Sequence, residues 1–199
     1  MDSYDLLPTT EITGTGLLTK VFIDLGISNF KDASMFVHNA EYGYNSNYED
    51  KLIFFKEKKG SCTSKHAVIG GLAEELHIPM TKEVAIYKFT EEVATGANAI
   101  LNKYNVPYVP MVHCYLVDNS HKFDLTEGNH NGKNRPIGED LVIYTEKVNP
   151  FISRRDEYAI FKRVLKEQIL LSDEFKGIEE MTVLRARDEA IKLLKKLIE

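Results

Sequence analysis

The central feature of the chain is a pair of β-type runs, Val109–Val117 and His121–Leu125, separated by a short turn. Two such runs joined by a turn predict an antiparallel hairpin. A further strand is expected over 84–89 and a short one over 52–55. Apolar residues at helical spacing lie on both sides of the hairpin, within 17–25, 28–38, 62–76, 91–101, 158–165 and 184–197. Helices around an antiparallel sheet predict an α+β fold.

The length and the composition predict one domain with appended helices. A chain of 199 residues suits a single domain, and its apolar content of 43% is enough to bury a core. Residues 1–16 are polar and rich in Gly and Thr, so we expect a poorly ordered N-terminal lead-in. The core is expected over 17–150. The helical patterns of 151–199 predict a C-terminal segment packed on or beside that core.

Charge and cysteine content argue against several classes of protein. The formal net charge is −5 without a long basic run, which disfavours nucleic acid as a partner. No apolar run approaches the roughly 18 residues of a membrane helix, and the start Met1–Asp5 is unlike a signal peptide. Two cysteines, Cys62 and Cys114, are too few for a disulfide framework. We therefore expect a soluble cytoplasmic protein with reduced cysteines, whose oligomeric state the sequence leaves open.

Cys62 stands where a loop is expected to become a helix. A thiol at a helix start faces unpaired N–H groups and the positive end of the helix dipole. Lys59 and Lys65 add positive charge nearby, so this setting favours the thiolate. Gly60 lacks a Cβ atom and would let a substrate backbone approach closely. Taken alone, the position is better explained by a buried structural cysteine.

The hairpin supplies a histidine and a carboxylate. With Asp118-Asn119 as a two-residue turn, Val117 lies opposite Ser120. The same register places His113 opposite Asp124, with Cβ atoms about 5 Å apart, where an imidazole can donate to a carboxylate and be oriented as a general base. A longer turn would shift the register and break this pairing. The other face is apolar and suited to packing: it carries Val112, Cys114, Leu116, Phe123 and Leu125.

These residues together resemble a known family. Gly60-Ser61-Cys62-Thr63-Ser64-Lys65-His66-Ala67 is followed by His113-Cys114-Tyr115-Leu116 and then by Phe123-Asp124-Leu125-Thr126. The ordered set resembles the transglutaminase-like branch of the papain-type cysteine enzymes, and most closely its small uncharacterised bacterial members. The resemblance covers roughly residues 40–126.

The resemblance implies a fold, a reaction and three roles. It implies an α+β core in which the cysteine helix packs on an antiparallel sheet. It implies Cys62 as the nucleophile, His113 as general base and then general acid, and Asp124 as the residue that orients His113. Acyl transfer would pass through a thioester, with a peptide, a protein or a small amide as the acyl donor. Hydrolysis is favoured over cross-linking because water is always present, and no metal or cofactor is implied.

Two features depart from the family. Many relatives place a tryptophan beside the cysteine or the histidine, and this chain has none. The upstream glutamine of papain-type enzymes is missing, because the only glutamine is Gln168. The backbone N–H of Cys62 is implied as one oxyanion donor. The candidates for the second oxyanion donor, or for a contact with the substrate, are Tyr44, Asn45 and Ser61. Asn45 is also typical of an ordinary turn. Loss of an oxyanion donor lowers a rate by about 10²–10³-fold, so the sequence leaves an inactive relative open.

The residues alone leave two alternatives for the histidines. Cys62, His66 and His113, with Asp124 as a fourth ligand, could bind a metal ion. His66 lies four residues after Cys62 on the same helical face, so it could replace His113 as the base.

A third alternative is a binding module that keeps the fold without turnover. Tyr42, Tyr44 and Tyr48, together with the polar 127–140 loop, could line a groove for a peptide or another protein. The same loop could also cover a catalytic site, and the sequence does not choose between these roles.

Overall fold

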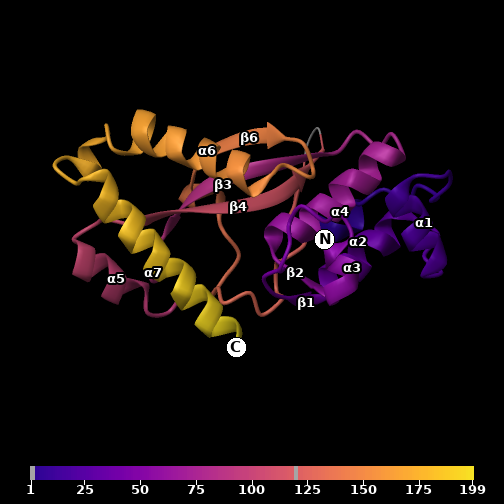
Figure 1. The fold of residues 1–199 in the computed structure, drawn as a ribbon, viewed down its shortest axis with the longest axis horizontal. Coiled ribbons are helices and arrows are strands. Elements are labelled where there is room, and N and C mark those ends of the chain that lie inside the picture. The colour runs from indigo at the N-terminus through magenta and orange to yellow at the C-terminus, as the bar shows by residue number, and fades with distance from the viewer. Residues whose placement is uncertain (1–2, 119–120) are drawn as a thin grey trace. The chain divides into compact units, whose positions relative to one another are not determined.

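The computed structural model describes residues 3–118 and 121–199 (Figure 1). The acidic start at Met1 and Asp2, and the residues Asn119 and Ser120 of the predicted two-residue turn, lie outside the described residues. The described chain combines helices with an antiparallel sheet, which agrees with the predicted α+β class at that level.

The elements follow one another along the chain with the helices concentrated at both ends. The helices are η1 (Ser3–Leu6), α1 (Leu17–Asp24), α2 (Phe30–Asn39), α3 (Ile53–Glu57), α4 (Cys62–Glu75), α5 (Ala97–Tyr104), η2 (Glu139–Leu141), α6 (Arg154–Val164), the π-helical turn η3 (Leu165–Ile169), η4 (Asp173–Phe175) and α7 (Glu180–Ile198). The strands are β1 (Glu41–Tyr42), β2 (Lys59–Gly60), β3 (Thr81–Phe89), β4 (Val109–Val117), β5 (Lys122–Phe123) and β6 (Val142–Val148). β1 pairs with β2 in a parallel ladder, and the larger sheet has the order β5-β4-β3-β6.

The chain divides into two compact units. Unit 1 consists of Met1–Val84, Cys114–Asn129 and Lys147–Ser153. Unit 2 consists of Ala85–His113, His130–Glu146 and Arg154–Glu199. The strands β3, β4 and β6 each continue from one unit into the other, so neither unit is a single stretch of sequence.

The core of unit 1 is built around α4, which contacts α1, α2 and α3. Gly71 of α4 allows this packing, because a Cβ atom there would lie 2.5 Å from Phe151 and 2.8 Å from Leu18. Leu116, Phe123 and Leu125 of the hairpin enter the same core, which confirms the apolar role predicted for their face.

The N-terminal lead-in differs from the prediction, because it is packed onto unit 1. Tyr4, Leu7 and Ile12 are buried in its core. The backbone is also paired: the N–H of Ile12 donates to the carbonyl of Ser28 at 2.8 Å. The prediction of a poorly ordered segment was wrong because it weighed the Gly and Thr content and overlooked these three apolar side chains.

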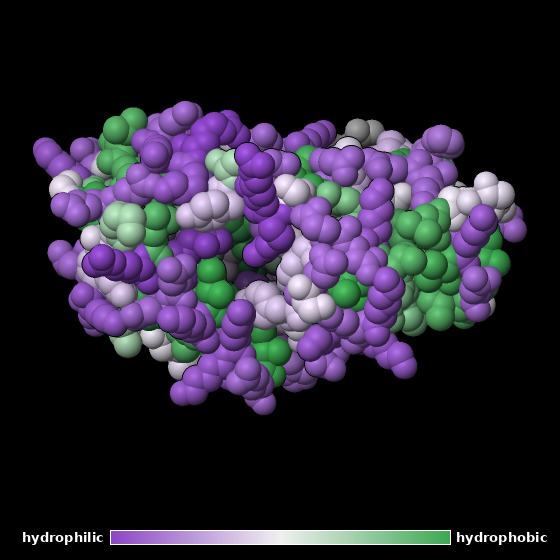
Figure 2. All heavy atoms as spheres, viewed as in Figure 1, coloured by the Kyte–Doolittle hydropathy of each residue, from purple (hydrophilic) through white to green (hydrophobic). Residues whose placement is uncertain are grey.

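One surface of unit 1 is unusually apolar. Figure 2 shows hydrophobic side chains gathered around α1, where Leu17, Ile23 and the following Leu25 are each nearly half exposed.

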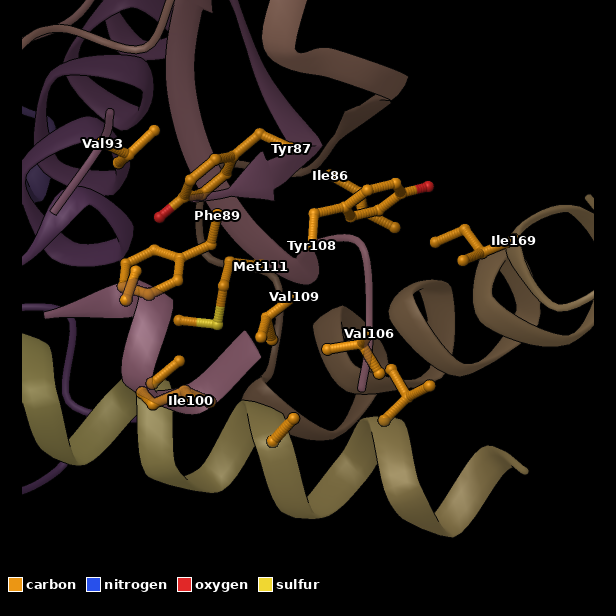
Figure 3. Close-up of a cluster of buried hydrophobic side chains, with 14 of the residues drawn as sticks. Ile86, Tyr87, Phe89, Val93, Ile100, Val106, Tyr108, Val109, Met111 and Ile169 are labelled. Carbon is orange, nitrogen blue, oxygen red and sulfur yellow. The ribbon is translucent and has the colours of Figure 1, made fainter. Parts of the chain in front are cut away.

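The core of unit 2 lies between its strand segments and the C-terminal helices. Figure 3 shows Phe89, Met111 and Ile100 close together within the buried cluster. Residues of α6 and α7, among them Phe161 and Val183, belong to the same cluster. The C-terminal helices therefore pack on the segments of β3 and β4 that lie in this unit.

The hairpin register differs from the prediction by two residues. Leu116 pairs with Phe123 and Val117 with Lys122. The connection is longer than two residues, because the N–H of Asp118 donates to the carbonyl of His121 at 3.1 Å. The direct pairing of His113 with Asp124 is therefore wrong. A shift of two preserves the alternation of faces, which is why the apolar face was still predicted correctly.

The strand expected over 52–55 is also wrong, since Ile53–Glu57 forms the short helix α3. Asp50 favours this turn, because its carboxylate accepts the N–H of Leu52 at 3.0 Å. A short apolar run does not distinguish a buried strand from a buried helical turn.

Candidate active site at the start of the cysteine helix

Cys62 is the first residue of α4, as predicted, and 9% of its surface is exposed. Ser61 before it has an extended backbone, and its side chain makes no capping hydrogen bond to the helix. A helix of 14 residues carries partial positive charge on the N–H groups of its first turn. The thiol therefore lies at the electropositive end of a helix that Ser61 does not cap.

Gly60 has a structural explanation that requires no substrate. A Cβ atom there would lie 2.7 Å from Oγ of Ser64 and 2.9 Å from Cδ2 of Phe54. The side of the backbone that the missing Cβ leaves open is thus filled by α4 and α3. The predicted approach of a substrate on this side is wrong.

His66 connects the start of α4 to the segment after β5. Its Nδ1 lies 2.7 Å from the carbonyl oxygen of Cys62, and the N–H of Leu125 donates to its Nε2 at 2.8 Å. A carbonyl only accepts and a backbone N–H only donates, so these bonds define a neutral ring protonated on Nδ1. The ring is completely buried. To act as a base, His66 would have to give up the bond from Leu125.

Asp124 lies beside this histidine. Its Oδ1 is 3.6 Å from Nε2 of His66. The same oxygen accepts the N–H of Thr126 at 2.9 Å and its hydroxyl at 2.6 Å. Tyr4 donates to the carbonyl oxygen of Asp124 at 2.6 Å. His66 is therefore a neighbour of Asp124.

His113 is 2% exposed and lies in β4. Its ring centroid is 6.3 Å from that of Tyr87 in β3, with an edge-to-face angle of 83°. His113 belongs to unit 2, whereas Cys62 and Asp124 belong to unit 1. Cys114, the second cysteine, is fully buried, and neither cysteine forms a disulfide.

Lys65 of α4 is fully buried and binds the end of α2. Its Nζ donates to the carbonyl oxygens of His38 at 2.9 Å and Ala40 at 2.5 Å. A cation at a helix C-terminus complements the helix dipole. Burial lowers the pKa of Lys65 to about 8, and the negative charge of Asp124 opposes this shift.

We expect the pKa of Lys65 to make stability depend on pH above about pH 8. Between that value and the ordinary lysine pKa of 10.5, the folded state has lost a proton that the unfolded chain still holds. Unfolding then takes up a proton, so the free energy of unfolding rises with pH across this window. Urea titrations at about pH 7 and about pH 10 measure the rise.

In Lys65→Met the contribution of this residue to the rise should disappear, whereas Lys20→Met, at an exposed lysine, should behave as the wild type. Equal pH slopes for the wild type and Lys65→Met would contradict the assignment.

The three candidates for the second oxyanion donor or substrate contact lie in unit 1, and they differ in the hydrogen bonds that their side chains already make. Asn45 uses both amide hydrogens within the loop, donating to Glu57 and to the carbonyl of Lys59, each at 2.9 Å. It therefore has no side-chain N–H left for an oxyanion. The hydroxyl of Ser61 lies 3.1 Å from that of Tyr48. Tyr44 packs edge-to-face on Tyr42, with ring centroids 6.4 Å apart.

The polar loop after Asn129 is bound to other parts of unit 2. The N–H of Asn134 donates to the carbonyl of Val93 at 2.6 Å, and its side-chain amide donates to that of Glu91 at 3.0 Å. A Cβ atom on Gly132 would lie 2.8 Å from the carbonyl oxygen of Leu194 in α7. These contacts fix the loop against the 91–95 segment and α7.

A small, partly open pocket lies within unit 1 beside α4. Its polar lining residues are Tyr48, Asp50, Lys51, Thr63, Ser64 and Lys82. Lys82 is completely buried and was not among the residues predicted to line a site. The alternation of side chains along the strand could have predicted this burial. Lys82 precedes Val84 and Ile86 by two and four residues, so all three share one face of β3.

Within 3–118 and 121–199, no three His, Cys, Asp or Glu side chains lie close enough together to hold a metal ion. The same ranges contain no helix with the length and apolar character needed to cross a bilayer.

Comparison with known proteins gave no relatives. No family model, no curated protein and no solved structure matches the chain.

Proposed function

We propose that the chain is a cysteine-dependent acyl-transfer enzyme with Cys62 as its nucleophile. The observation that carries the proposal is the position of Cys62 on the first turn of α4, next to a Ser61 that does not cap the helix. Partial positive charge there stabilises a thiolate over a thiol. The thiolate is the reactive form of cysteine.

The proposed reaction has two steps. Sγ of Cys62 attacks the carbonyl carbon of an amide, a histidine takes the thiol proton, and the same histidine returns it to the leaving amine as the C–N bond breaks. Water then attacks the resulting thioester and releases the acid and the thiol. A peptide, a protein or a small amide is the proposed acyl donor.

The proposal assigns the proton transfers to His113, with Asp124 as the carboxylate of the site. The bonds of His66 support this choice, because both of its ring nitrogens are used by the backbone. The hairpin register no longer supports a direct pair between His113 and Asp124. The role of Asp124 toward His113 therefore rests on the resemblance to the transglutaminase-like enzymes.

Alkylation with iodoacetamide tests the nucleophile. We expect rapid labelling of Cys62 well below the roughly pH 8.5 at which a free thiol ionises. Cys114, fully buried, is the internal control and should be labelled only after unfolding. Peptide mapping by mass spectrometry locates the label. Labelling of Cys62 only above about pH 8 would contradict the proposal.

A non-catalytic binding module is the second candidate function, and one observation favours it. Asn45 has no side-chain N–H left for an oxyanion, which leaves Tyr44 and Ser61 of the three candidates for the second donor. A chain without that donor would keep the fold and lose about 10²–10³-fold in rate. Rapid labelling of Cys62 without hydrolysis of amide or thioester substrates would indicate this function.

A further inference from the structure

We propose that Tyr48 is a positioning residue for Cys62: it holds the hydroxyl of Ser61 away from the start of α4, so that this hydroxyl does not cap the helix. The inference rests on the proposed acyl transfer, because it explains how the helix start stays electropositive at the nucleophile. The residues concerned, between Asn45 and Ser64, all lie in unit 1.

Ser61 has the residue type and the backbone conformation of a helix cap, yet its side chain does not cap α4. Serine is among the residues preferred directly before a helix, where its oxygen accepts an N–H of the second or third helical residue. The backbone of Ser61 is extended, with φ −81° and ψ 178°, as is typical of that position. Its hydroxyl nevertheless makes no capping hydrogen bond. A contact outside the helix therefore has to hold this side chain.

Tyr48 supplies that contact. Its hydroxyl oxygen lies 3.1 Å from Oγ of Ser61. The same oxygen accepts the backbone N–H of Asn45 at 3.3 Å, which helps to fix its position. Ser61 is only 3% exposed, so water competes little for this bond. Whichever hydroxyl donates, the bond turns the serine side chain toward the tyrosine.

The segment that leads to Tyr48 is itself bound to α4 and β2. Oγ of Ser64, in the first turn of α4, donates to Oδ1 of Asn45 at 2.6 Å. The side-chain amide of Asn45 donates to the carbonyl of Lys59 in β2 at 2.9 Å. These bonds fix Asn45, three residues before Tyr48, against the chain on both sides of Ser61. The tyrosine hydroxyl is therefore held in place within the folded chain itself.

A capped helix start would favour the thiolate of Cys62 less. The hydroxyl oxygen of a capping Ser61 would satisfy one N–H of the first turn and would place its negative partial charge at that end of the helix. Both effects reduce the positive potential that stabilises an anion there. By turning the hydroxyl away, Tyr48 preserves this potential for the nucleophile.

The pH profile of Cys62 alkylation by iodoacetamide tests this role in the full chain, with Cys114→Ala as the background. The quantity compared is the midpoint, which is the pH at half of the maximal rate. Tyr48→Phe removes only the hydroxyl oxygen, and we expect it to raise the midpoint by about 0.5 pH unit, or to slow alkylation about threefold below the midpoint. Added to Ser61→Ala, Tyr48→Phe should leave the midpoint of that variant unchanged, because alanine cannot cap.

Tyr104→Phe is the matched control, since it loses a hydroxyl hydrogen bond to Glu189 within unit 2. It should keep the wild-type midpoint. Two outcomes would overturn the role of Tyr48. The first is an unchanged midpoint in Tyr48→Phe, and the second is an equal rise in the Ser61→Ala background, which would indicate a general effect on the loop.

Should Tyr48→Phe fail to fold, Ser61→Asn tests the same step with the tyrosine in place. The amide of this neutral capping residue can donate to the Tyr48 hydroxyl while its oxygen accepts from the helix, so the midpoint should again rise. An unchanged midpoint in Ser61→Asn would overturn the inference as well.

The same profiles separate this inference from the proposed function. A wild-type midpoint above about pH 8 would contradict both, because Cys62 would then ionise as an ordinary thiol. A low wild-type midpoint that does not depend on Tyr48 would contradict the role of Tyr48 and leave the proposed nucleophile supported.

Discussion

Replacing His66 by alanine is expected to lower the free energy of unfolding by about 3–5 kcal/mol, the largest stability effect that we expect from one substitution. The change removes the acceptor for the N–H of Leu125 and the partner of the Cys62 carbonyl. Each buried group left without a partner costs about 1–3 kcal/mol, and the cavity adds to this. For a chain of 199 residues the melting temperature should fall by roughly 6–20 °C.

Two partial replacements sharpen this prediction. In His66→Asn the amide N–H can still donate to the Cys62 carbonyl, and in His66→Gln the side-chain oxygen can still accept from Leu125. Both should be more stable than His66→Ala and less stable than the wild type. His121→Ala is the matched control, since that side chain is 45% exposed, and it should change the melting temperature little. A His66→Ala protein as stable as the control would contradict the hydrogen bonds described for His66.

Replacing His113 by alanine is expected to slow the alkylation of Cys62 at about pH 7 by about 10-fold or more. A cysteine with an ordinary pKa is only a few per cent thiolate at that pH. The start of α4 raises this fraction for Cys62, and the proposed proton transfer to His113 raises it further. Measuring the rate in a Cys114→Ala background assigns all of the label to Cys62. His113→Gln, which keeps more of the side-chain volume, should be equally slow.

The decisive comparison is the alkylation rate of Cys62 in folded His66→Ala protein. There the alkylation rate should stay close to that of the wild type, because its ring is bound to the backbone at both nitrogens. Loss of reactivity in His66→Ala with no loss in His113→Ala would transfer the role of base to His66. It would also make Asp124, 3.6 Å from that ring, the carboxylate of the same group.

The sequence predicted best those elements whose pattern is long and regular. The strand expected over Val109–Val117 has the same bounds as β4. Its nine residues are mostly apolar and include three valines, and such a composition strongly favours a strand. The helix after Gly60 was predicted from the apolar residues between Ala67 and Leu76 and from Pro79, which follows its end. The hairpin register failed because the side chain of Asp118 accepts the N–H of His121 at 2.8 Å, which stabilises a longer turn than the dipeptide suggested.

Features that depend on tertiary contacts could not be predicted from the sequence. The role of His66 requires knowing that Leu125 lies beside α4, which no local pattern indicates. The full use of the Asn45 amide likewise follows from a contact with Glu57, twelve residues away. Lys82 was hidden because a lysine beside Thr81 and Glu83 looks like an exposed strand end, although its phase with Val84 points inward.

The way that the strands pass between the two units limits how the protein can be dissected. Each unit draws on three separate stretches of chain, so any contiguous fragment that contains all of one unit also contains parts of the other. A truncation after Val84 would remove Leu116 and Phe123 from the core around α4, and a fragment beginning at Ala85 would begin in the middle of β3. Isolating one half for crystallography or interaction studies would therefore require joining its three stretches with new linkers.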